Sequence, residues 1–363
     1  MRNPLHFALV VGISCYPGGY PKLLGPENDA NEFAKWVTSS SGGGVPPKNV
    51  ARCITTASAT MRLEDARPTK ENIDFQLLAL RDKAITAYNE LPEEQRAQAK
   101  AETSRLYIYL AGHGIMPGGG TAALLDARAQ RTRCTNLEIR SYEDWFRRDG
   151  TFAEVCIFAD CCRNFELLAP GGGPDFNEPG ELGGRVFSLV GYATSEGEQA
   201  FEESGQFDPE VSSDDRRGYF SRALIDGLEG KATHPRTGYV TDASLQTYVS
   251  AQVMERTANR PMYQRQAIDM LPNPGHPMTF GPKREVPYYR VVIRFRPELS
   301  GDIDLVAPDG SLSDRWRVSD GPWTKRLHDG LWTVQHAGTD RDTTGFDGNG
   351  TFGVIGADLD VQL

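Results

Sequence analysis

Short, nearly continuous apolar segments alternate with stretches of helical periodicity through most of the chain, and this alternation is the feature that most constrains its fold. Each segment is rich in Val, Ile, Leu, Ala and aromatic residues, as expected of a strand that is buried on both faces. The predicted strands are residues 6–14, 50–55, 105–114, 154–160 and 185–194. This pattern predicts an α/β fold with a mostly parallel sheet flanked by helices.

Between these strands, apolar residues recur three and four positions apart, which predicts amphipathic helices. Thr69 is a good N-cap residue, Gly230 closes a helix, and Thr241 or Asp242 begins the last helix. The predicted helices are residues 27–40, 68–91, 142–149, 219–230 and 241–257. Two long loops, 169–184 and 202–217, are rich in Gly, Pro, Ser and acidic residues, and loops of this length are uncommon unless they are functional or mobile.

After residue 280 the pattern changes to short alternating runs separated by Gly, Asp and Pro turns. Such runs predict a small all-β sandwich over residues 288–363. We therefore divide the chain into a first domain of residues 1–280, a linker of residues 281–287 and this C-terminal domain. The C-terminal domain contains no catalytic constellation, and we expect it to bind a partner or to regulate the first domain.

The composition excludes several classes of partner. The 363-residue chain has a formal net charge of −10, which disfavours binding to nucleic acid or to an anionic membrane and is compatible with a cationic substrate. No apolar stretch approaches the ~20 residues that span a bilayer, and the run at residues 7–14 lacks the basic leader and exit site of a signal peptide. The six cysteines are irregularly spaced, which predicts a reduced protein in the cytoplasm.

Two of the predicted strands end in residues that carry chemistry. The segment at 105–114 ends in Gly-His-Gly with His113, and the segment at 154–160 runs into Asp-Cys-Cys-Arg with Cys162. Ligands of parallel α/β sheets bind beyond the carboxyl ends of the strands, and neighbouring strands lie only ~4.8 Å apart. If the two strands are neighbours, an imidazole and a thiol meet at the sheet edge. Their separation of 49 residues is close to that of caspase-like enzymes.

Side-chain alternation chooses between the two adjacent cysteines. Asp160 and Cys162 share one parity along the strand, whereas Cys161 shares the other and is expected to point into the packing. The thiolate is the nucleophilic form of cysteine, and His113 can take the thiol proton and later protonate a leaving amine. The Gly114 N–H is expected to point toward a developing oxyanion.

Several segments together resemble the caspase-like cysteine peptidases of clan CD, specifically the metacaspase and bacterial caspase-like branch. They are ALVVGISCY, LLGPENDANEF, PTKENI, YIYLAGHG, IFADCCRN and GYFSRALIDGL, and they cover roughly residues 5–280. The resemblance implies the caspase-hemoglobinase fold and endopeptidase activity on protein or peptide substrates.

Carried over to this chain, the resemblance implies that His113 and Cys162 form a catalytic dyad. Asp160 matches the acidic residue two positions before the nucleophile, and Asp29 matches the Asp of the N-D-A block. In metacaspases these two carboxylates line a pocket for a basic side chain, although the residues alone favour Asp29 as a first-turn helix acid stabilised by the helix dipole. With no Arg or Lys between them, the two carboxylates predict cleavage after Arg and less well after Lys. Alternation predicts that Arg163 points away from this pocket.

Two details depart from the family pattern. Asn164 matches neither the His-Ser-Gly of metacaspases nor the Arg-Gly of caspases. Many metacaspases bind calcium through an acidic pair between the His and Cys motifs, but the comparable stretch CTNLEIRSYED has no Asp-Asp pair. We therefore expect no metal and no other cofactor, and calcium is kept as the alternative.

The loop at 202–217 is a candidate processing segment because it ends in Arg216 and Arg217, and exposed polar loops are preferred sites of nicking. The alternative is a plain mobile loop.

Two other functions compete with the endopeptidase. One is a catalytically inactive caspase-like scaffold or interaction protein, but inactive relatives lose the His or the Cys and this chain has both. The other is a redox or metal protein that uses Cys161 and Cys162. A zinc site there would lack a fourth ligand and a C-x-x-C pair.

Overall fold

The computed structural model describes most of the chain. The described residues are 3–56, 62–94, 96, 104–118, 120–166, 168–177, 185–204, 206–212, 215–273, 275–286, 288–308, 310–328, 330–338, 343, 346, 350–354 and 357–363. The chain divides into two compact units, Met1–His234 with Tyr239–Lys283, and Pro235–Gly238 with Arg284–Leu363. Residues 178–184 of the first long loop, and 205, 213 and 214 of the second, lie outside the described residues.

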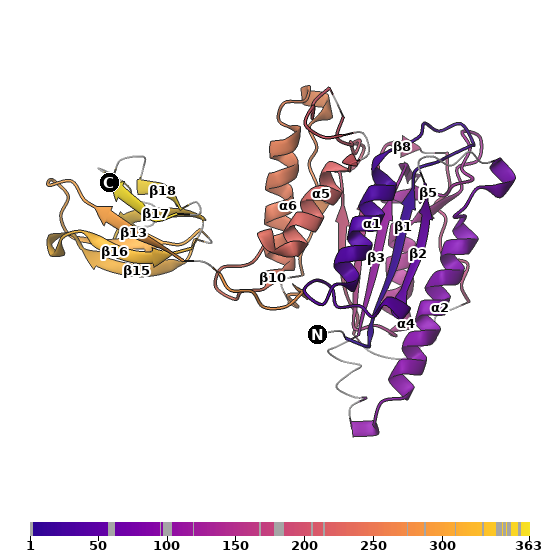
Figure 1. Ribbon diagram of the computed structural model, residues 1–363, viewed down its shortest axis with the longest axis horizontal. Helices are drawn as coiled ribbons and strands as arrows, with labels where there is room; N and C mark the ends of the chain where they lie inside the picture. The colour runs from indigo at the N-terminus through magenta and orange to yellow at the C-terminus, as the bar shows by residue number, and fades with distance from the viewer. Residues whose placement is uncertain are drawn as a thin grey trace. The chain divides into compact units, whose positions relative to one another are not determined.

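A six-stranded sheet forms the frame of the larger unit, in the order β11-β9-β7-β3-β1-β2 (Figure 1). All neighbouring pairs are parallel except β11 with β9. The strands are β1 His6–Ile13, β2 Val50–Thr55, β3 Arg105–Ala111, β7 Glu154–Asp160, β9 Phe187–Tyr192 and β11 Asp269–Met270. The predicted mostly parallel α/β sheet is therefore confirmed. Three of the predicted strands are too long: β1 ends at Ile13 and not at residue 14, β3 ends at Ala111 and not at residue 114, and β9 spans Phe187–Tyr192 and not 185–194.

Helices cover both faces of this sheet, as Figure 1 shows. They are α1 Gly25–Thr38, α2 Lys70–Asn89, α4 Ile139–Asp149, α5 Tyr219–Asp226 and α6 Asp242–Thr257. Alternate strand residues point to opposite faces. Leu9 and Ile157 share an apolar cluster with residues of α2 and α4, whereas Val10 and Phe158 share one with residues of α1, α5 and α6. Both faces are thus buried, which explains the continuous apolar runs.

The helix ends follow local chemistry. The predicted start of α2 is confirmed, because the Thr69 hydroxyl accepts the Asn72 N–H at 3.3 Å while the Asn72 side chain accepts the Thr69 N–H at 3.0 Å. The helix predicted over 219–230 ends earlier, at Asp226, and a π-turn at Gly227–Lys231 follows it. Gly230 has the positive φ of 121° that ends this turn.

Short strands that the sequence pattern did not predict form a second, four-stranded sheet in the order β6-β5-β4-β8. They are β4 Gly114–Pro117, β5 Ala123–Leu125, β6 Asn136–Glu138 and β8 Phe165–Glu166. β4 begins just after the β3 strand end and β8 just after the β7 strand end, and the two pair in parallel. This small sheet therefore ties together the segments that leave the two chemically reactive strand ends.

The remaining regular elements of the larger unit are minor. β10 Val240–Thr241 pairs with β12 Thr279–Phe280, and single 3₁₀ turns occur at Pro47–Asn49, Leu63–Asp65 and Met262–Gln264. Within the described ranges, none of the helices has the length and apolar character needed to cross a bilayer.

The smaller unit consists of strands, as the alternating runs predict. They are β13 Tyr289–Arg294, β14 Asp302–Val306, β15 Leu312–Arg317, β16 Trp323–Leu327, β17 Gly330–His336, β18 Thr351–Val354 and β19 Leu359–Gln362, with a 3₁₀ turn at Val318–Asp320. They form a three-stranded sheet, β16-β13-β19, and a four-stranded sheet, β15-β14-β17-β18. Residues of both sheets, among them Ile293, Trp323, Leu305 and Val334, share one apolar core.

The Thr69 cap gives a test of the fold. Replacing Thr69 with Ala leaves the Asn72 N–H in the first turn of α2 without its side-chain acceptor, which costs about 1 kcal/mol. We expect Thr69→Ala to lower the melting temperature by roughly 2–4 °C in thermal unfolding followed by circular dichroism. Thr86→Ala, at an exposed position of the same helix, is the control and should stay within about 1 °C. Equal shifts in the two variants would show that the cap does not hold this helix.

Candidate active site

The His and Cys of the two strand ends lie at the same level of the sheet. β3 and β7 are adjacent and parallel, and Ala111 is the register partner of Asp160. His113 and Cys162 each follow two residues beyond that pair, and both line one cavity of about 120 Å³. The fold therefore brings the imidazole and the thiol to the same opening, as the strand-end argument predicts.

His113 is held by its surroundings on three sides. Its backbone N–H donates to the Tyr16 hydroxyl at 2.9 Å, and the rings of Tyr16 and Tyr20 lie 4.9 and 5.6 Å from the imidazole. Gly112 adopts a φ of 155°, and a Cβ there would lie 2.4 Å from the Tyr16 hydroxyl oxygen. A side chain at position 112 would collide with this hydroxyl, so the residue before His113 must be glycine.

The protonation state of His113 follows from its contacts. Its Nε2 lies 2.7 Å from the carbonyl oxygen of Pro21. A carbonyl can only accept, so Nε2 carries the hydrogen and Nδ1 holds the lone pair. Burial lowers the pKa of His113, and the Pro21 carbonyl raises it less. The imidazole is therefore neutral near pH 7 and can take up a proton at Nδ1.

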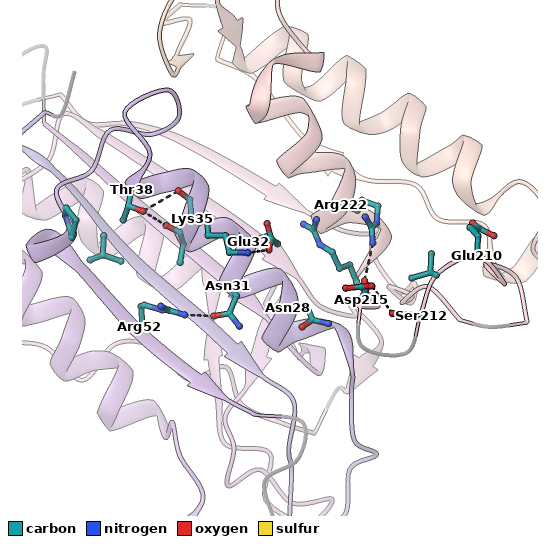
Figure 2. Close-up of a pocket in the computed structure, with 15 residues that line it drawn as sticks. Asn28, Asn31, Glu32, Lys35, Thr38, Arg52, Glu210, Ser212, Asp215 and Arg222 are labelled. Atoms are coloured by element: carbon teal, nitrogen blue, oxygen red, sulfur yellow. Dashed lines mark hydrogen bonds and ion pairs between the residues drawn. The ribbon is translucent and has the colours of Figure 1, made fainter.

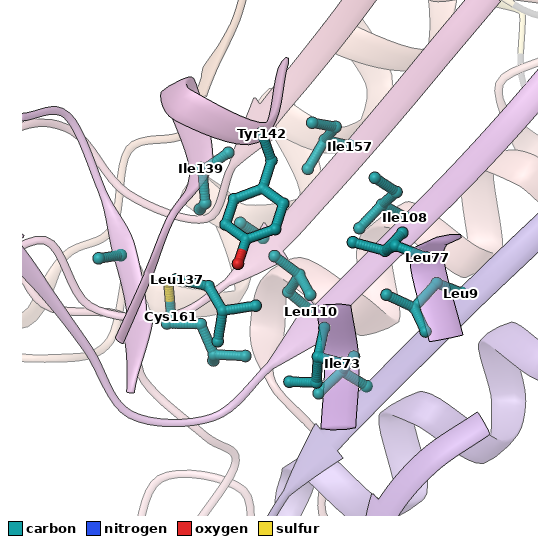
Figure 3. Packing of buried hydrophobic residues seen from close by; sticks show 14 of the residues in the cluster. Leu9, Ile73, Leu77, Ile108, Leu110, Leu137, Ile139, Tyr142, Ile157 and Cys161 are labelled. Carbon is teal, nitrogen blue, oxygen red and sulfur yellow. The ribbon is translucent and has the colours of Figure 1, made fainter. Parts of the chain in front are cut away.

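The two adjacent cysteines have different surroundings. Cys161 is 2% exposed and belongs to the apolar cluster around α2 and α4, where Figure 3 shows its side chain. Cys162 is half-buried, lines the cavity, and its Sγ lies 3.6 Å from the Ala200 carbonyl oxygen. Cys161 lines the cavity as well, but of the two cysteines only Cys162 is partly exposed. Burial raises the pKa of Cys162, so the resting thiol is protonated and needs a base.

Gly114 packs directly against the cysteine pair. A Cβ on Gly114 would lie 2.5 Å from the Cys162 carbonyl oxygen and 2.7 Å from the Cys161 sulfur. The rest of β4 is also held to the segment after the cysteines, because the Met116 N–H donates to the Asn164 carbonyl at 2.7 Å. Asn164, the residue that differs from the family pattern, therefore contributes its backbone carbonyl to the contact between the segments of β4 and β8.

Asp160 lines the same cavity, and its side chain is buried. Its Oδ2 accepts the backbone N–H of Ser221 at 3.1 Å and also the Ser221 hydroxyl, which in turn contacts the Tyr109 hydroxyl. Burial raises the pKa of Asp160 to about 6, more than these hydrogen bonds lower it. The carboxylate is therefore ionised at pH 7 and neutral a unit or more below pH 6.

Asp29 also lines the cavity, but its surroundings differ from the expectation. The Arg217 Nε donates to Asp29 Oδ1 at 3.0 Å, and the Gly218 N–H donates to Oδ2 at 2.9 Å. Burial and the nearby Asp160 raise the pKa of Asp29, and Arg217 opposes them. The sequence argument expected no cation between the two carboxylates, whereas an arginine 188 residues away neutralises one of them.

The cavity has a further acidic residue that sequence reasoning missed. Glu202 lines it beside Ala200 and Phe201, on the segment that follows β9. In the sequence, Glu202 was one acid among several in the 202–217 loop. Nothing in its spacing distinguished it, because its contacts are with Leu24 and Gly25, far away along the chain.

Arg163 points away from the cavity, as alternation predicts. Its side chain is 1% exposed, and its ring neighbour is Tyr192, 4.4 Å from the guanidinium carbon. Nη1 donates to Asp269 Oδ2 at 2.8 Å and to the Thr194 carbonyl at 3.2 Å, and Nη2 donates to Glu196 Oε1 at 3.2 Å. Its charge is thus balanced at the β9–β11 edge of the sheet.

The candidate processing residues lie at the closing end of the 202–217 loop. The Glu203 N–H donates to the Arg217 carbonyl at 2.9 Å, so the two ends of the loop are joined. The Arg216 carbonyl accepts the Asn28 side-chain amide at 2.9 Å, and the Arg217 side chain is only 11% exposed. The described ends of the loop are therefore attached to α1 and to the wall of the cavity.

A larger cavity of about 900 Å³ lies along α1, and its lining includes Glu210, Ser212, Asp215 and Arg222 (Figure 2). It contains neither the histidine nor the cysteine of the strand ends. Several of its polar groups bond one another: Lys35 pairs with Glu32, and the Arg222 guanidinium donates to the Asp215 carbonyl at 3.2 Å. We therefore place the chemistry in the smaller cavity.

The described residues offer no obvious metal centre. Among them, His, Cys, Asp and Glu side chains do not gather in groups of three or more that could hold an ion. Cys161 and Cys162 both line the cavity, but the Cys161 side chain is 2% exposed and packs in the apolar cluster around α2 and α4.

Comparisons with known proteins agree with this geometry. The family described as caspase domain matches residues 5–271, a span that includes every residue of the cavity. A protein named as a probable protease from a Desulfuromonadales bacterium is 26% identical over 244 residues, which cover 62% of this chain. The chain spans only 26% of the length of that relative. The family match covers well over half of the sequence, and the chain belongs to the caspase-domain family of peptidases.

Proposed function

We propose that the protein is a cysteine endopeptidase that uses His113 and Cys162 to hydrolyse peptide bonds after Arg and, less well, after Lys. The observation that carries this proposal is the shared cavity at the ends of β3 and β7, which contains a neutral imidazole, a half-buried thiol and carboxylates. A cysteine mechanism is also what the family implies.

The residues of the cavity suit each step of acyl transfer. Nδ1 of His113 takes the proton of the Cys162 thiol, and the sulfur forms a bond to the scissile carbonyl carbon. The Gly114 N–H, held against the cysteine backbone, donates to the oxyanion that develops. His113 then gives its proton to the leaving nitrogen, and the C–N bond breaks to leave a thioester. Water attacks the thioester, His113 takes a proton from it, and the thiol is regenerated as the acid leaves.

The charges around the cavity favour a basic residue before the scissile bond. Asp160 lies two residues before Cys162 and is ionised at pH 7, while the positive charge of Arg163 is balanced outside the cavity. A guanidinium can meet a carboxylate through two parallel hydrogen bonds, whereas an ammonium is a point charge, so Arg is preferred over Lys. An acidic side chain would be repelled at this site.

Loop cleavage is proposed as a step in activation. A cut after Arg216 or Arg217 would release the segment that bonds Asn28 and Asp29. The sequence of the loop supplies the basic residues that such an enzyme recognises.

Alanine variants test the dyad. We expect Cys162→Ala and His113→Ala each to lower kcat/KM for an arginine peptide by at least about 10³-fold, with the double variant no worse than either single one, because groups that act as a unit are non-additive. Cys161→Ala is the matched control, since its sulfur lies in the apolar cluster, and it should keep a measurable part of the activity. Equal loss in both cysteine variants, or a near-normal rate in His113→Ala, would contradict the assignment.

The pH dependence of specificity tests the role of Asp160. Two fluorogenic peptides differ only before the cut, where one has Arg and the other its neutral analogue citrulline. Protonation of His113 affects both, so their kcat/KM ratio isolates the charge of the cavity. Lowering the pH from 7 to 5 protonates about nine-tenths of a carboxyl with a pKa of about 6 and should lower the ratio roughly tenfold.

In Asp160→Asn this part of the pH dependence should disappear, leaving the contributions of Asp29 and Glu202, whose pKa values are also raised by burial. A wild-type ratio that does not change with pH, or preferred cleavage of a peptide with Asp before the cut, would refute the basic specificity.

Intact-mass measurement tests the processing step. After incubation, the wild type should show a cut after Arg216 or Arg217, and Cys162→Ala should remain uncut. Adding a small amount of active wild type to Cys162→Ala should cut it if the reaction occurs between molecules. An enzyme that is fully active and remains uncut would remove loop cleavage from the mechanism.

A further inference from the structure

A separate cavity of about 610 Å³ is lined by neither His113 nor Cys162. One of its walls is the segment 131–136, which joins β5 to β6, and the other is the segment 166–172 at the end of β8. The start of α2 completes the lining. We call it the hairpin cavity, after the tight turn in its first wall.

Hydrogen bonds fix both walls of the hairpin cavity. Gln130 and Arg133 exchange two backbone bonds, at 2.9 and 3.0 Å, and so close a two-residue turn. The Asn136 side chain donates to the Pro170 carbonyl at 3.0 Å and accepts the Gly172 N–H at 2.8 Å, which links the two walls. A Cβ on Gly172 would lie 2.0 Å from the Asn136 carbonyl oxygen, so a glycine is required where the walls meet. The cavity therefore has a fixed floor.

Tyr20 connects the hairpin cavity to the catalytic histidine. Its ring lies 5.6 Å from the His113 imidazole, and its hydroxyl lies 3.5 Å from the Sγ of Cys134, which lines the hairpin cavity. The guanidinium carbon of Arg131 lies 4.9 Å from the centroid of the same ring. Burial lowers the pKa of His113, and the charge of Arg131 lowers it further. The two sites are therefore neighbours that share one aromatic contact.

The turn presents two arginines whose charge is not balanced. Arg131 and Arg133 are both exposed, and within the described part of the chain neither of them forms an ion pair. Lys70, the third cation of the lining, differs from them because its ammonium pairs with Asp74 at 2.8 Å and with Asp175 at 2.7 Å. The positive charge that a ligand would meet in this cavity is therefore that of the two arginines.

The acidic residues of the lining do not cancel this charge. Asp126 is buried, and its carboxylate accepts the backbone N–H groups of Lys70 at 3.0 Å and of Arg128 at 2.9 Å. Glu71 lies in the first turn of α2, where the helix dipole and Arg128 stabilise its charge. Glu166 is exposed on the opposite wall. Two unpaired guanidinium groups thus face one carboxylate that is free to answer them.

The substrate residues that follow the cut begin at the imidazole. In the proposed mechanism His113 protonates the leaving nitrogen, so this nitrogen lies within hydrogen-bond reach of the ring. An extended chain advances about 3.3–3.6 Å per residue, so the next two to four residues cover about 7–14 Å. Tyr20 and then Arg131 are the first and second contacts outward from the imidazole. A carboxylate carried on this stretch can accept two parallel hydrogen bonds from a guanidinium.

We propose that the hairpin cavity binds the part of the substrate that follows the cut, and that Arg131 and Arg133 select an acidic residue about two to four positions after the scissile bond. The inference rests on the proposed endopeptidase function. It adds a second requirement to the basic residue before the cut, so that the preferred substrate is a polypeptide in which a basic residue is closely followed by an acidic one.

The first test uses internally quenched peptides with Arg before the cut and Glu, Gln or Lys at the second, third or fourth residue after it. At one of these positions the wild type should cleave the Glu peptide with a kcat/KM at least about threefold above that of the Gln peptide, mainly through KM, and the Lys peptide should be poorest. Equal values for Glu and Gln at all three positions would overturn the inference.

Variants of the two arginines identify the source of this preference. The double variant Arg131→Gln with Arg133→Gln should cleave the Glu and Gln peptides equally, and Arg131→Glu with Arg133→Glu should favour the Lys peptide. A role limited to supporting Tyr20 would lower kcat for every peptide and leave the ratio unchanged, which would refute the site. Arg148→Gln is the matched control, because this arginine is exposed on α4 and lines neither cavity, so it should keep the wild-type ratio.

The second test needs no turnover. Binding of the same peptides, labelled with a fluorophore, to Cys162→Ala is followed by fluorescence anisotropy. The Glu peptide should bind more tightly than the Gln peptide, and high salt should reduce the difference, because exposed charges are screened. Selective binding that depends on the two arginines, without cleavage by the wild type, would refute the endopeptidase and support the site. Cleavage with the same Glu-to-Gln ratio in the wild type and the Gln double variant would support the endopeptidase and refute the site.

Discussion

The arrangement of the whole site depends on the in-register parallel pairing of β3 and β7. Ala111 faces Asp160 across the two strands, and the chain leaves each strand with a fixed number of residues before its reactive side chain. Successive side chains of a strand point to opposite faces. A register shift of one residue between β3 and β7 would therefore place Cys161, and not Cys162, beside His113. The short β4–β8 pairing beyond the strand ends opposes such a slip, because it joins the same two segments a second time.

Much of this frame can be predicted from the sequence because its cause is local. Uninterrupted apolar runs predict the strands, Thr69 predicts the start of α2, and alternation separates Cys161 from Cys162. The end of β3 could not be predicted in this way. The absence of a side chain at Gly112 leaves room for the Tyr16 hydroxyl, which accepts the His113 N–H from 97 residues away along the chain. The small second sheet was also missed, since strands of two to four residues are too short to show a period.

The electrostatics of the site could be predicted least. The sequence argument placed Asp29 and Asp160 together, and the structure does bring both to the cavity. It did not predict the hydrogen bond from Arg217 to Asp29 or the position of Glu202 in the wall of the same cavity. Both residues lie on a long polar loop whose path is set by tertiary contacts and not by periodicity. The buried carboxylates have raised pKa values, which means that their ionisation lowers the free energy of unfolding. Such local costs are typical of functional sites.

Hydrogen bonds join the two ends of the 202–217 loop, so the position of its base is fixed independently of the segment between the ends. Glu202 with Gly218, and Glu203 with Arg217, hold the two ends side by side, so the carboxylate positions do not depend on the residues between them. Lengthening a closed loop costs little, about 0.6 kcal/mol for each doubling. The intervening segment is therefore a site where evolution can insert, remove or exchange sequence at small thermodynamic cost. Relatives can in this way differ in the length and sequence of this segment while the residues at its base keep their places in the wall of the cavity.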